Sequence, residues 1–332
     1  AIKAASNQGI VIKGSNSLDE YAQVDTFVFD KTGTLTTGVP KIQRIIAYEG
    51  YDDEEVLRIA ACLEEHFYHP IATAVVKKAE DEGIEHEEMH GKLTHVASKG
   101  IVSSIDGKRV VIGSLELLED EKTIISNEQK AVIEEYSQKY NLLYLSYDGK
   151  LIAIFLIDTP LRGEAIALLK ELKEKGKQIV LLTGDTQKRT ETICSLIPFD
   201  RVYTQVKPEQ KHQVIEQLQE EGHHVLMIGD GINDSAALSL ANVGIVMAGA
   251  SDIARQASDI LFLNEQLTGL EVLENITEQL NRQLDANLKH TVGINSFLMG
   301  LGLIDVVSPS LLAVLHNVTT TFIIGKSLTY IQ

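Results

Sequence analysis

The sequence predicts an α/β fold, in which a doubly wound parallel sheet is interrupted by an inserted α+β domain and followed by a helical tail. Helix-like and strand-like segments alternate from Asp158 to residue 247, which is typical of a parallel sheet covered by helices. A continuous apolar run at 26–29 lies far upstream and has the character of a central strand of such a sheet. Residues 41–153, between them, have a different texture. One sheet therefore begins before the insertion and is completed after it.

The first segments are short and lead into the predicted central strand. Residues 1–8 have a helical pattern, residues 10–12 form an apolar strand, and a second helix extends to Tyr21. After the strand at 26–29, Gly38-Val39-Pro40 breaks the pattern. The insertion is expected to follow this break.

The insertion begins with two helical segments and continues with strands. Residues 52–66 and 69–83 have the helical pattern, and the later strands are joined by Asp-Gly pairs at 106–107 and 148–149, which are typical of antiparallel hairpins. We therefore predict a discontinuous sheet domain at residues 1–40 and 155–275, an inserted domain at 41–154 and a tail at 276–332.

The tail contains two apolar runs, at residues 291–304 and 311–331. Each is near the lower limit of a membrane span, which needs about 17–25 residues. Because the runs are adjacent, we expect a hairpin of two transmembrane helices, with Lys289 and His290 at a cytoplasmic flank. Buried core helices are the alternative.

Composition restricts the class of function and the compartment. A net charge of −17 argues against a nucleic-acid-binding surface, which needs a basic patch. The two cysteines have no ligand-like spacing, which suits a reducing compartment without a disulfide framework. The chain starts at Ala1 without a signal-peptide pattern, and we expect it to be a segment of a longer protein or a processed product.

Polar residues follow four of the predicted strands, where parallel sheets bind their ligands. A single aspartate in such a place is often a helix cap, but four groups in order predict a site. The groups are Asp30 with Thr32, Thr183-Gly184-Asp185, Lys207 to Lys211, and Asp230 with Asn233 and Asp234.

These residue types suit phosphoryl transfer. A carboxylate such as Asp30 can attack a phosphoryl group and form an aspartyl-phosphate, while Thr183 and Lys211 can donate to the phosphoryl oxygens. Asp30, Asp230 and Asp234 would repel one another unless a divalent cation lay among them, and Mg²⁺ suits carboxylate oxygens.

Thr32 indicates that the acyl-phosphate persists. A phosphatase of this design would carry a proton donor two residues after its nucleophile, and a threonine is a poor general acid. A stored intermediate suggests an energy-coupling machine.

Three motifs, DKTGTLT at 30–36, TGD at 183–185 and GDGINDS at 229–235, resemble the cation-transporting P-type ATPases, which have a haloacid-dehalogenase-type phosphorylation domain. The resemblance covers the whole chain. It implies an ATP hydrolase and translocase that uses ATP and Mg²⁺, with Asp30 phosphorylated and Thr32 beside the Mg²⁺ ligands. It also implies a multi-pass protein of a membrane, such as the cell membrane, with cytoplasmic catalytic domains.

The inserted domain resembles that of the heavy-metal branch. His69-Pro70 matches its His-Pro signature, which implies that His69 lies at the adenine of ATP. Ser98, Gly100 and Gly113 match its glycine-containing nucleotide loop, with serine in place of the first glycine, which puts the affinity for ATP in doubt. Gly184, Asp185 and Asn233 complete the residues that the resemblance assigns to the nucleotide and phosphate.

The resemblance also implies a missing partner and a transported ion. No Thr-Gly-Glu actuator motif occurs, so we expect the upstream half of the pump, with the actuator domain and other membrane helices, to be required for transport. Asn295, His316 and Asn317 are polar groups within the apolar runs and are candidate contacts of the ion. They favour Zn²⁺, Co²⁺, Fe²⁺ or Mn²⁺ over Cu⁺. Alternatively, they only hydrogen-bond neighbouring helices.

Two other functions stay open. A soluble phosphatase of the same superfamily is opposed by Thr32, by His69-Pro70 and by the apolar tail. An inactive remnant of a pump is favoured by Ser98 and opposed by the intact phosphorylation residues.

Overall fold

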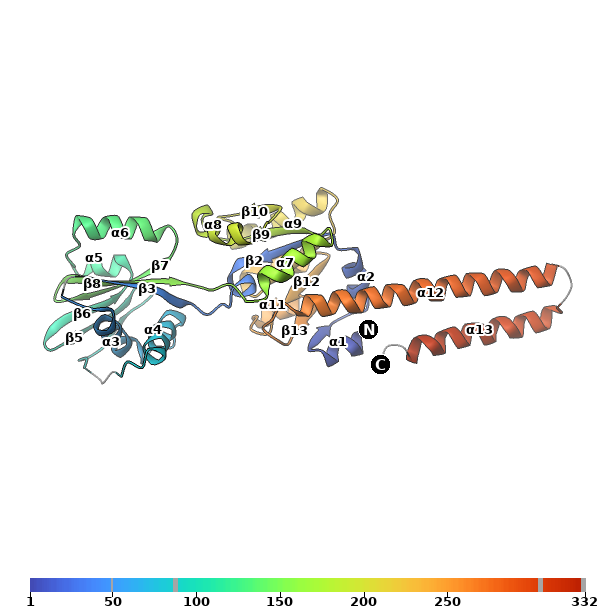
Figure 1. Ribbon diagram of the computed structural model, residues 1–332, viewed down its shortest axis with the longest axis horizontal. Coiled ribbons are helices and arrows are strands. Elements are labelled where there is room, and N and C mark those ends of the chain that lie inside the picture. The colour runs from blue at the N-terminus through green and yellow to red at the C-terminus, as the bar shows by residue number, and fades with distance from the viewer. Residues whose placement is uncertain (49, 86–88, 304–306, 330–332) are drawn as a thin grey trace.

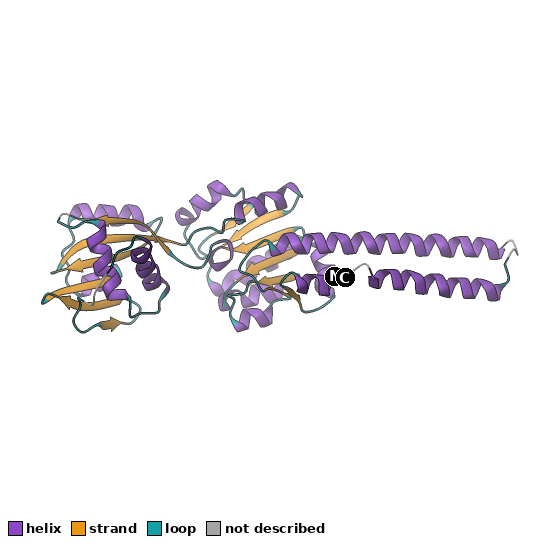
Figure 2. Ribbon diagram, turned by 60° about the horizontal axis from the view of Figure 1, so that its bottom comes forward, coloured by secondary structure: helices purple, strands orange, loops and turns teal. Residues whose placement is uncertain are grey.

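The structure is a computed structural model that describes all residues except 49, 86–88, 304–306 and 330–332. Three parts follow one another along its long axis: the inserted domain, the parallel-sheet domain and a hairpin of two long helices (Figure 1). The second view shows the same order, with the strands confined to the first two parts (Figure 2).

The parallel-sheet domain is assembled from both ends of the chain. Its elements are α1 (Ile2–Asn7), β1 (Ile10–Ile12), α2 (Asn16–Gln23), β2 (Thr26–Asp30), α7 (Ala165–Glu174), β9 (Gln178–Leu182), α8 (Gln187–Leu196), β10 (Arg201–Tyr203), α9 (Lys211–Glu220), β11 (Val225–Gly229), α10 (Ser235–Leu240), β12 (Val243–Val246), α11 (Asp252–Ala257) and β13 (Ile260–Phe262). The seven strands have the order β1-β13-β12-β11-β2-β9-β10, and β1 is antiparallel to its neighbour while the other pairs are parallel.

Strand β2 lies inside this sheet and is buried along its whole length. Phe27 and Phe29 belong to the core on one face of the sheet, whereas Val28 belongs to the core on the other face. This alternation follows from the pleat, which points successive side chains to opposite faces. The absence of polar residues between Thr26 and Asp30 is therefore explained by helices covering both faces.

The inserted domain has its own sheet and its own cores. It contains β3 (Lys41–Ala47), α3 (Asp53–Glu64), α4 (Pro70–Asp81), β4 (Thr94–Val96), β5 (Gly100–Ile105), β6 (Lys108–Gly113), α5 (Leu115–Asp120), α6 (Asn127–Ser137), β7 (Asn141–Tyr147) and β8 (Lys150–Asp158). The strands pair antiparallel in the order β3-β8-β7-β6-β5-β4. Both Asp-Gly pairs form tight hairpin turns with positive φ, at Asp106-Gly107 and Asp148-Gly149, as the sequence predicts.

The tail is a helical hairpin of α12 (Gly269–Leu303) and α13 (Pro309–Thr329). The start of α12 is packed against the parallel-sheet domain, since Leu270 and Leu273 belong to its core. Tyr21 of α2 also donates a hydrogen bond of 2.9 Å to the Glu274 carboxylate. Further along, large apolar side chains of both helices, such as Phe297 and Phe322, are exposed.

The predicted transmembrane hairpin is not confirmed. In the part of the chain that the structure describes, no helix combines the length and the apolar character that a bilayer crossing requires. Helix α12 is polar and charged up to Lys289 and His290, and its apolar run begins after them. Helix α13 is continuous, but polar residues, namely His316, Asn317 and a run of threonines, divide its apolar sequence near the middle.

Candidate functional site

A pocket of about 280 Å³ lies at the carboxyl ends of the central strands. The sequence-predicted residues of all four strand ends line it, namely Asp30, Thr32, Thr183, Gly184, Asp185, Lys211, Asp230, Asn233 and Asp234. Their meeting follows from the topology, because β9, β2 and β11 are adjacent and parallel, so that their ends point to one edge.

Lys211 joins two of the carboxylates in this pocket. It is the first residue of α9, and its ammonium donates to Asp30 Oδ1 at 2.7 Å and to Asp234 Oδ1 at 2.6 Å. All three side chains are buried, with 6%, 6% and 1% of Asp30, Lys211 and Asp234 exposed. Charged hydrogen bonds of this length are the strong ones, so the ammonium holds the two carboxylates in place.

The carboxylates carry more negative charge than the lysine neutralises. Burial, followed by the charge of Asp234, raises the pKa of Asp30 to about 7, against the opposing effect of Lys211. Burial and Asp234 also raise the pKa of Asp230. Burial acts to lower the pKa of Lys211, but Asp30 and Asp234 outweigh it and raise that pKa. The pocket therefore favours additional positive charge.

The carboxylates of Asp30, Asp230 and Asp234 fit a hard divalent cation. Oxygen atoms of the three lie within 4.8 Å of one another. Carboxylate oxygens facing an open pocket are the ligands that Mg²⁺ takes, together with water and phosphate oxygens. Burial is the main cause of the raised pKa of Asp30 and Asp230, and a cation in this place would relieve the repulsion between carboxylates that adds to it.

Gly33 makes room for Asp230. It lies in the turn Lys31–Leu35 that follows β2, with φ of +75°, and a Cβ built there would be 1.6 Å from Asp230 Oδ2. Any other residue would displace the Asp230 carboxylate, since every L-side chain begins with this atom. The glycine of the DKTGTLT motif thus has a steric reason at this site.

Sequence reasoning missed Arg162. This arginine precedes α7 and is 9% exposed. Its guanidinium donates to the backbone oxygens of Thr34 at 2.8 Å and Gly33 at 2.9 Å, and also to that of Glu265. It therefore holds the turn after Asp30 against the segment that leads into α12. A buried arginine surrounded by carbonyl oxygens has no local sequence pattern, because its acceptors lie more than 100 residues away.

Two further contacts hold the turn that follows Asp30, one within the turn and one from the loop after β9. Thr36 accepts a hydrogen bond of 3.2 Å from the Gly33 amide. Lys31 forms an ion pair with Asp185, and the Asp185 amide donates to Thr183 Oγ1 at 3.1 Å. Asp185 thus contacts the turn that follows Asp30, while Asn233 is an exposed residue that lines the pocket.

The other predicted nucleotide residues lie in the inserted domain (Figure 1). His69 caps α4, where its Nδ1 accepts a hydrogen bond of 3.3 Å from Ile71, and Pro70 is the first helical residue. Gly100 and Gly113 pair across β5 and β6, and a Cβ on either would lie 2.2 Å from a carbonyl oxygen. Ser98 has φ of +61°, a backbone conformation that favours glycine.

In the tail, the structure joins two of the three predicted ion contacts. His316 Nδ1 lies 2.8 Å from Asn295 Oδ1, so that a hydrogen bond links α13 to α12. Asn317 instead lines a separate groove together with Val318, Thr321 and Phe322.

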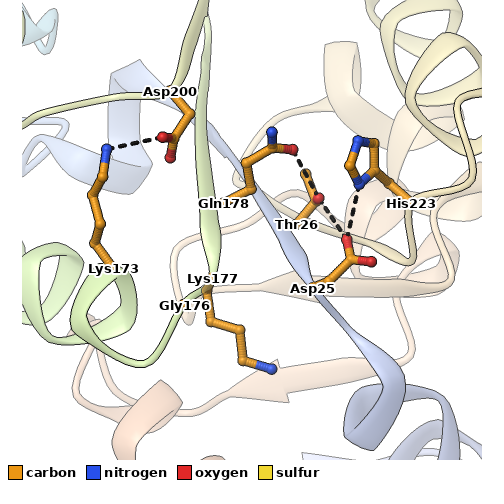
Figure 3. Close-up of a pocket in the computed structure, with 8 residues that line it drawn as sticks. All are labelled: Asp25, Thr26, Lys173, Gly176, Lys177, Gln178, Asp200 and His223. Carbon is orange, nitrogen blue, oxygen red and sulfur yellow. Dashed lines mark hydrogen bonds and ion pairs between the residues drawn. The ribbon is translucent and has the colours of Figure 1, made fainter.

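A second depression, of about 470 Å³, lies at the opposite ends of β2 and β9 (Figure 3). Lys173 pairs with Asp200 and His223 with Asp25, while Lys177, which also lines the depression, donates to the carbonyl oxygen of Val24. The cluster of buried carboxylates lies instead in the pocket at the carboxyl ends of the strands.

Comparisons with known proteins agree with this geometry. The model of the haloacid dehalogenase-like hydrolases matches residues 24–242. A zinc-exporting P-type ATPase of Mycobacterium marinum is 33% identical over 331 residues, which are 98% of this chain and 45% of that protein. A manganese-exporting P-type ATPase of Mycobacterium tuberculosis is 32% identical over 98% of this chain and 46% of its own length.

Among solved structures, a zinc-transporting PIB-type ATPase has a TM-score of 0.87 and covers the whole chain at 24% sequence identity, with 54% of its own chain covered. This likeness shows a shared fold. The chain spans about half the length of the curated relatives it matches. It belongs to the haloacid dehalogenase-like hydrolase family, and its relatives within that family are heavy-metal P-type ATPases.

Proposed function

We propose that Asp30 is the nucleophile of an ATP-driven ion pump and accepts the γ-phosphoryl group of ATP. One carboxylate oxygen attacks the phosphorus, a new O–P bond forms, and the bond to the leaving ADP oxygen breaks. The observation that carries this proposal is the buried contact of Lys211 with Asp30 and Asp234 at the ends of parallel strands.

The other residues of the pocket orient the Asp30 carboxylate and neutralise the charge of the phosphoryl oxygens. Lys211 holds the Asp30 carboxylate ready for attack and offers its charge to the phosphoryl oxygens as they arrive. Thr183 and the amides beside Gly184 donate to the same oxygens. Asp30, Asp230 and Asp234, with Thr32, hold Mg²⁺, which supplies charge neutralisation for the transferring group.

Thr32 makes the phosphorylated state long-lived. It lines the pocket two residues after Asp30, where a carboxylic acid would assist hydrolysis, and its hydroxyl is a poor proton donor. The stored acyl-phosphate can then be coupled to a conformational change.

The inserted domain binds ATP in this proposal. His69 and Pro70 at the start of α4 receive the adenine, and the turn at Ser98 with Gly100 and Gly113 receives the remainder of the nucleotide. The paired glycines let β5 and β6 approach each other closely beside this turn, which fixes its position.

The whole protein would export a transition-metal cation across a membrane. Relatives named for zinc and manganese export support these ions as substrates, in agreement with the oxygen and nitrogen donors of Asn295, His316 and Asn317. The catalytic domains would lie on the cytoplasmic side, where ATP is found. Since the chain spans about half of these relatives, its upstream half is the expected partner for transport.

Labelling with [γ-³²P]ATP tests the proposal. The longer protein that includes the upstream half is incubated with Mg²⁺ and a series of transition metals, and acid-stable label is tested with hydroxylamine, which cleaves acyl-phosphates. Label that depends on one or two metals and is absent in Asp30→Asn is expected. Label that survives Asp30→Asn, or that ignores every metal, contradicts the assignment.

A further inference from the structure

A cluster of two histidines and one glutamate lies in the inserted domain, away from the pocket around Asp30. Glu65 and His66 directly follow α3, and His90 precedes β4. A carboxylate oxygen and the two imidazole nitrogens lie within 4.8 Å of one another. These atoms are ligands of borderline transition metals, which they bind at about 2.0–2.2 Å.

His90 is prepared for such a role by its own hydrogen bonding. Its Nδ1 lies 2.9 Å from the carbonyl oxygen of Gly91. Because a carbonyl oxygen can only accept, Nδ1 carries the proton and the lone pair is on Nε2. Nε2 is buried and has no hydrogen-bond partner within the described parts of the chain. Metal-binding histidines show this arrangement, in which one nitrogen donates to a carbonyl and the other binds the ion.

The backbone on both sides of His90 is fixed. His90 pairs with Ile105 as an isolated antiparallel bridge, and the Gly91 amide donates to the Ser104 oxygen at 2.8 Å. The Met89 amide donates to the sulfur of Cys62 at 3.4 Å, and Cys62 is buried on α3. The segment that carries His90 is therefore tied to the same helix from whose end Glu65 and His66 extend. Such attachment reduces the ordering needed when a ligand binds.

His66 supplies access from solvent. Its ring is perpendicular to that of His90 at a centroid distance of 5.2 Å, and its Nε2 lies 3.4 Å from Glu65 Oε1. The side chain of His66 is 42% exposed, whereas that of Glu65 is 24% exposed. An ion can therefore enter from the His66 side and keep a water molecule as a further ligand.

We propose that Glu65, His66 and His90 form a binding site for a divalent transition-metal ion such as Zn²⁺. The site is separate from the Mg²⁺ ligands at Asp30 and from the polar groups of α12 and α13. An ion here joins the connection between α3 and α4 to the segment before β4. His69, the N-cap of α4, lies only three residues after His66. A metal ion bound to His66 would therefore restrain the start of α4.

The proposal does not depend on phosphorylation and is tested on the full chain of 332 residues. Zn²⁺ is titrated by calorimetry with Mg²⁺ in excess, so that the carboxylates at Asp30 are not available. His66→Asn and His90→Asn are each expected to weaken Zn²⁺ binding by about tenfold or more. Asp30→Asn is expected to leave the affinity unchanged, which separates this site from the proposed catalytic one.

His223→Asn is the matched control. His223 also lies beside a carboxylate, that of Asp25 at 3.3 Å, but belongs to no three-ligand cluster among the described residues. Its substitution should leave Zn²⁺ affinity within twofold of the original. The site assignment is rejected if the chain binds no Zn²⁺, if both cluster variants bind as tightly as the original, or if His223→Asn loses as much affinity as they do.

A spectroscopic measurement identifies the ligand atom. In ¹⁵N spectra of the imidazoles, Zn²⁺ should shift Nε2 of His90 while Nδ1 stays protonated. A shift at His95 or His212 without one at His90 would overturn the proposal. Circular dichroism shows whether each variant is folded. If His90→Asn is not, His66→Asn, whose side chain is exposed, decides the question.

Discussion

Lys211 is the residue whose loss should most disturb the pocket at the strand ends. Its ammonium contacts Asp30 and Asp234, and the three groups have 9% or less of their side chains exposed. Removing one partner from such a buried arrangement leaves uncompensated charge, which costs more than the pair itself contributes. The lysine is thus a structural as well as a chemical requirement.

We expect Lys211→Met to lower the free energy of unfolding by about 3 kcal/mol in the absence of Mg²⁺, because Asp30 and Asp234 then face each other unneutralised. Urea denaturation measures this. Adding Asp234→Asn to the variant should recover part of the loss. A double variant as unstable as Lys211→Met would show that repulsion is not the cause.

Gly33 carries the second prediction at this scale. In Gly33→Ala the new Cβ would meet the Asp230 carboxylate. Holding an alanine at φ of +75° would cost the folded state about 1–2 kcal/mol in addition. We expect Mg²⁺ affinity, measured by calorimetry, to fall at least tenfold as Asp230 is displaced. Gly163→Ala is the control, since nothing lies within 4 Å of a Cβ there. Equal affinities in the two variants would contradict the steric role of Gly33.

At the scale of elements, the turn between β4 and β5 is strained by one residue. Ser98 has φ of +61°, whereas Gly100, two residues later, has the conformational freedom that its φ of +143° requires. On the sequence alone, a serine at position 98 put only the affinity for ATP in doubt. The structure shows that this serine also has an unfavourable backbone conformation.

Ser98→Gly should therefore stabilise the inserted domain by about 1 kcal/mol, since glycine adopts left-handed φ without a steric penalty. Thermal denaturation checks this. Ser104→Gly, inside β5 and next to its last residue, should instead destabilise the domain by about 0.5–1 kcal/mol. Destabilisation by both changes would mean that Ser98 is not strained.

Helix α12 is joined to the parallel-sheet domain through a short segment. Leu270 and Leu273 are fully buried, and Tyr21 donates to Glu274 at 2.9 Å. Burial, followed by Glu274, raises the pKa of Tyr21 well above its ordinary value, so the hydroxyl stays protonated and donates throughout the neutral range.

Tyr21→Phe removes this donor and should lower the free energy of unfolding by about 1 kcal/mol, the usual net value of one hydrogen bond, as measured by urea denaturation. Tyr68→Phe, at a fully exposed tyrosine, should change nothing. If the two variants have the same stability, the Tyr21 contact does not help to hold α12.

For the whole molecule, the two globular parts should unfold separately. Each has its own sheet and its own hydrophobic cores, and the chain passes between them twice, before β3 and after β8. Parts with separate cores need not unfold in one two-state transition.

Calorimetric scanning of the full chain should therefore show more than one transition. Mg²⁺ at about 100 times its dissociation constant should stabilise the parallel-sheet domain by about 2.7 kcal/mol and raise its transition, leaving that of the inserted domain in place. Asp230→Asn combined with Asp234→Asn should abolish the shift. A single transition that moves as a whole would contradict the independence of the two parts.

The sequence determined which residues would meet at the strand ends. Asp30, Thr183, Lys211 and Asp230 follow apolar runs of strand type, and the parallel arrangement of such strands brings their carboxyl ends to one edge. The two Asp-Gly turns of the inserted domain could also be predicted from the sequence, because the conformation of a two-residue turn depends on its own residues. The apolar runs of the tail predicted helices correctly, but among the described residues no helix is both long and apolar enough to cross a membrane.

Only the tertiary structure decided what holds these residues in place. Arg162 reaches Gly33 and Thr34 across the fold, Gly33 leaves room for Asp230, and His90 meets His66 beside the end of α3. These contacts join residues far apart in the chain and depend on how elements pack. A sequence pattern records which face of an element is apolar, but the partner of a buried polar group is chosen by the packing of the whole domain.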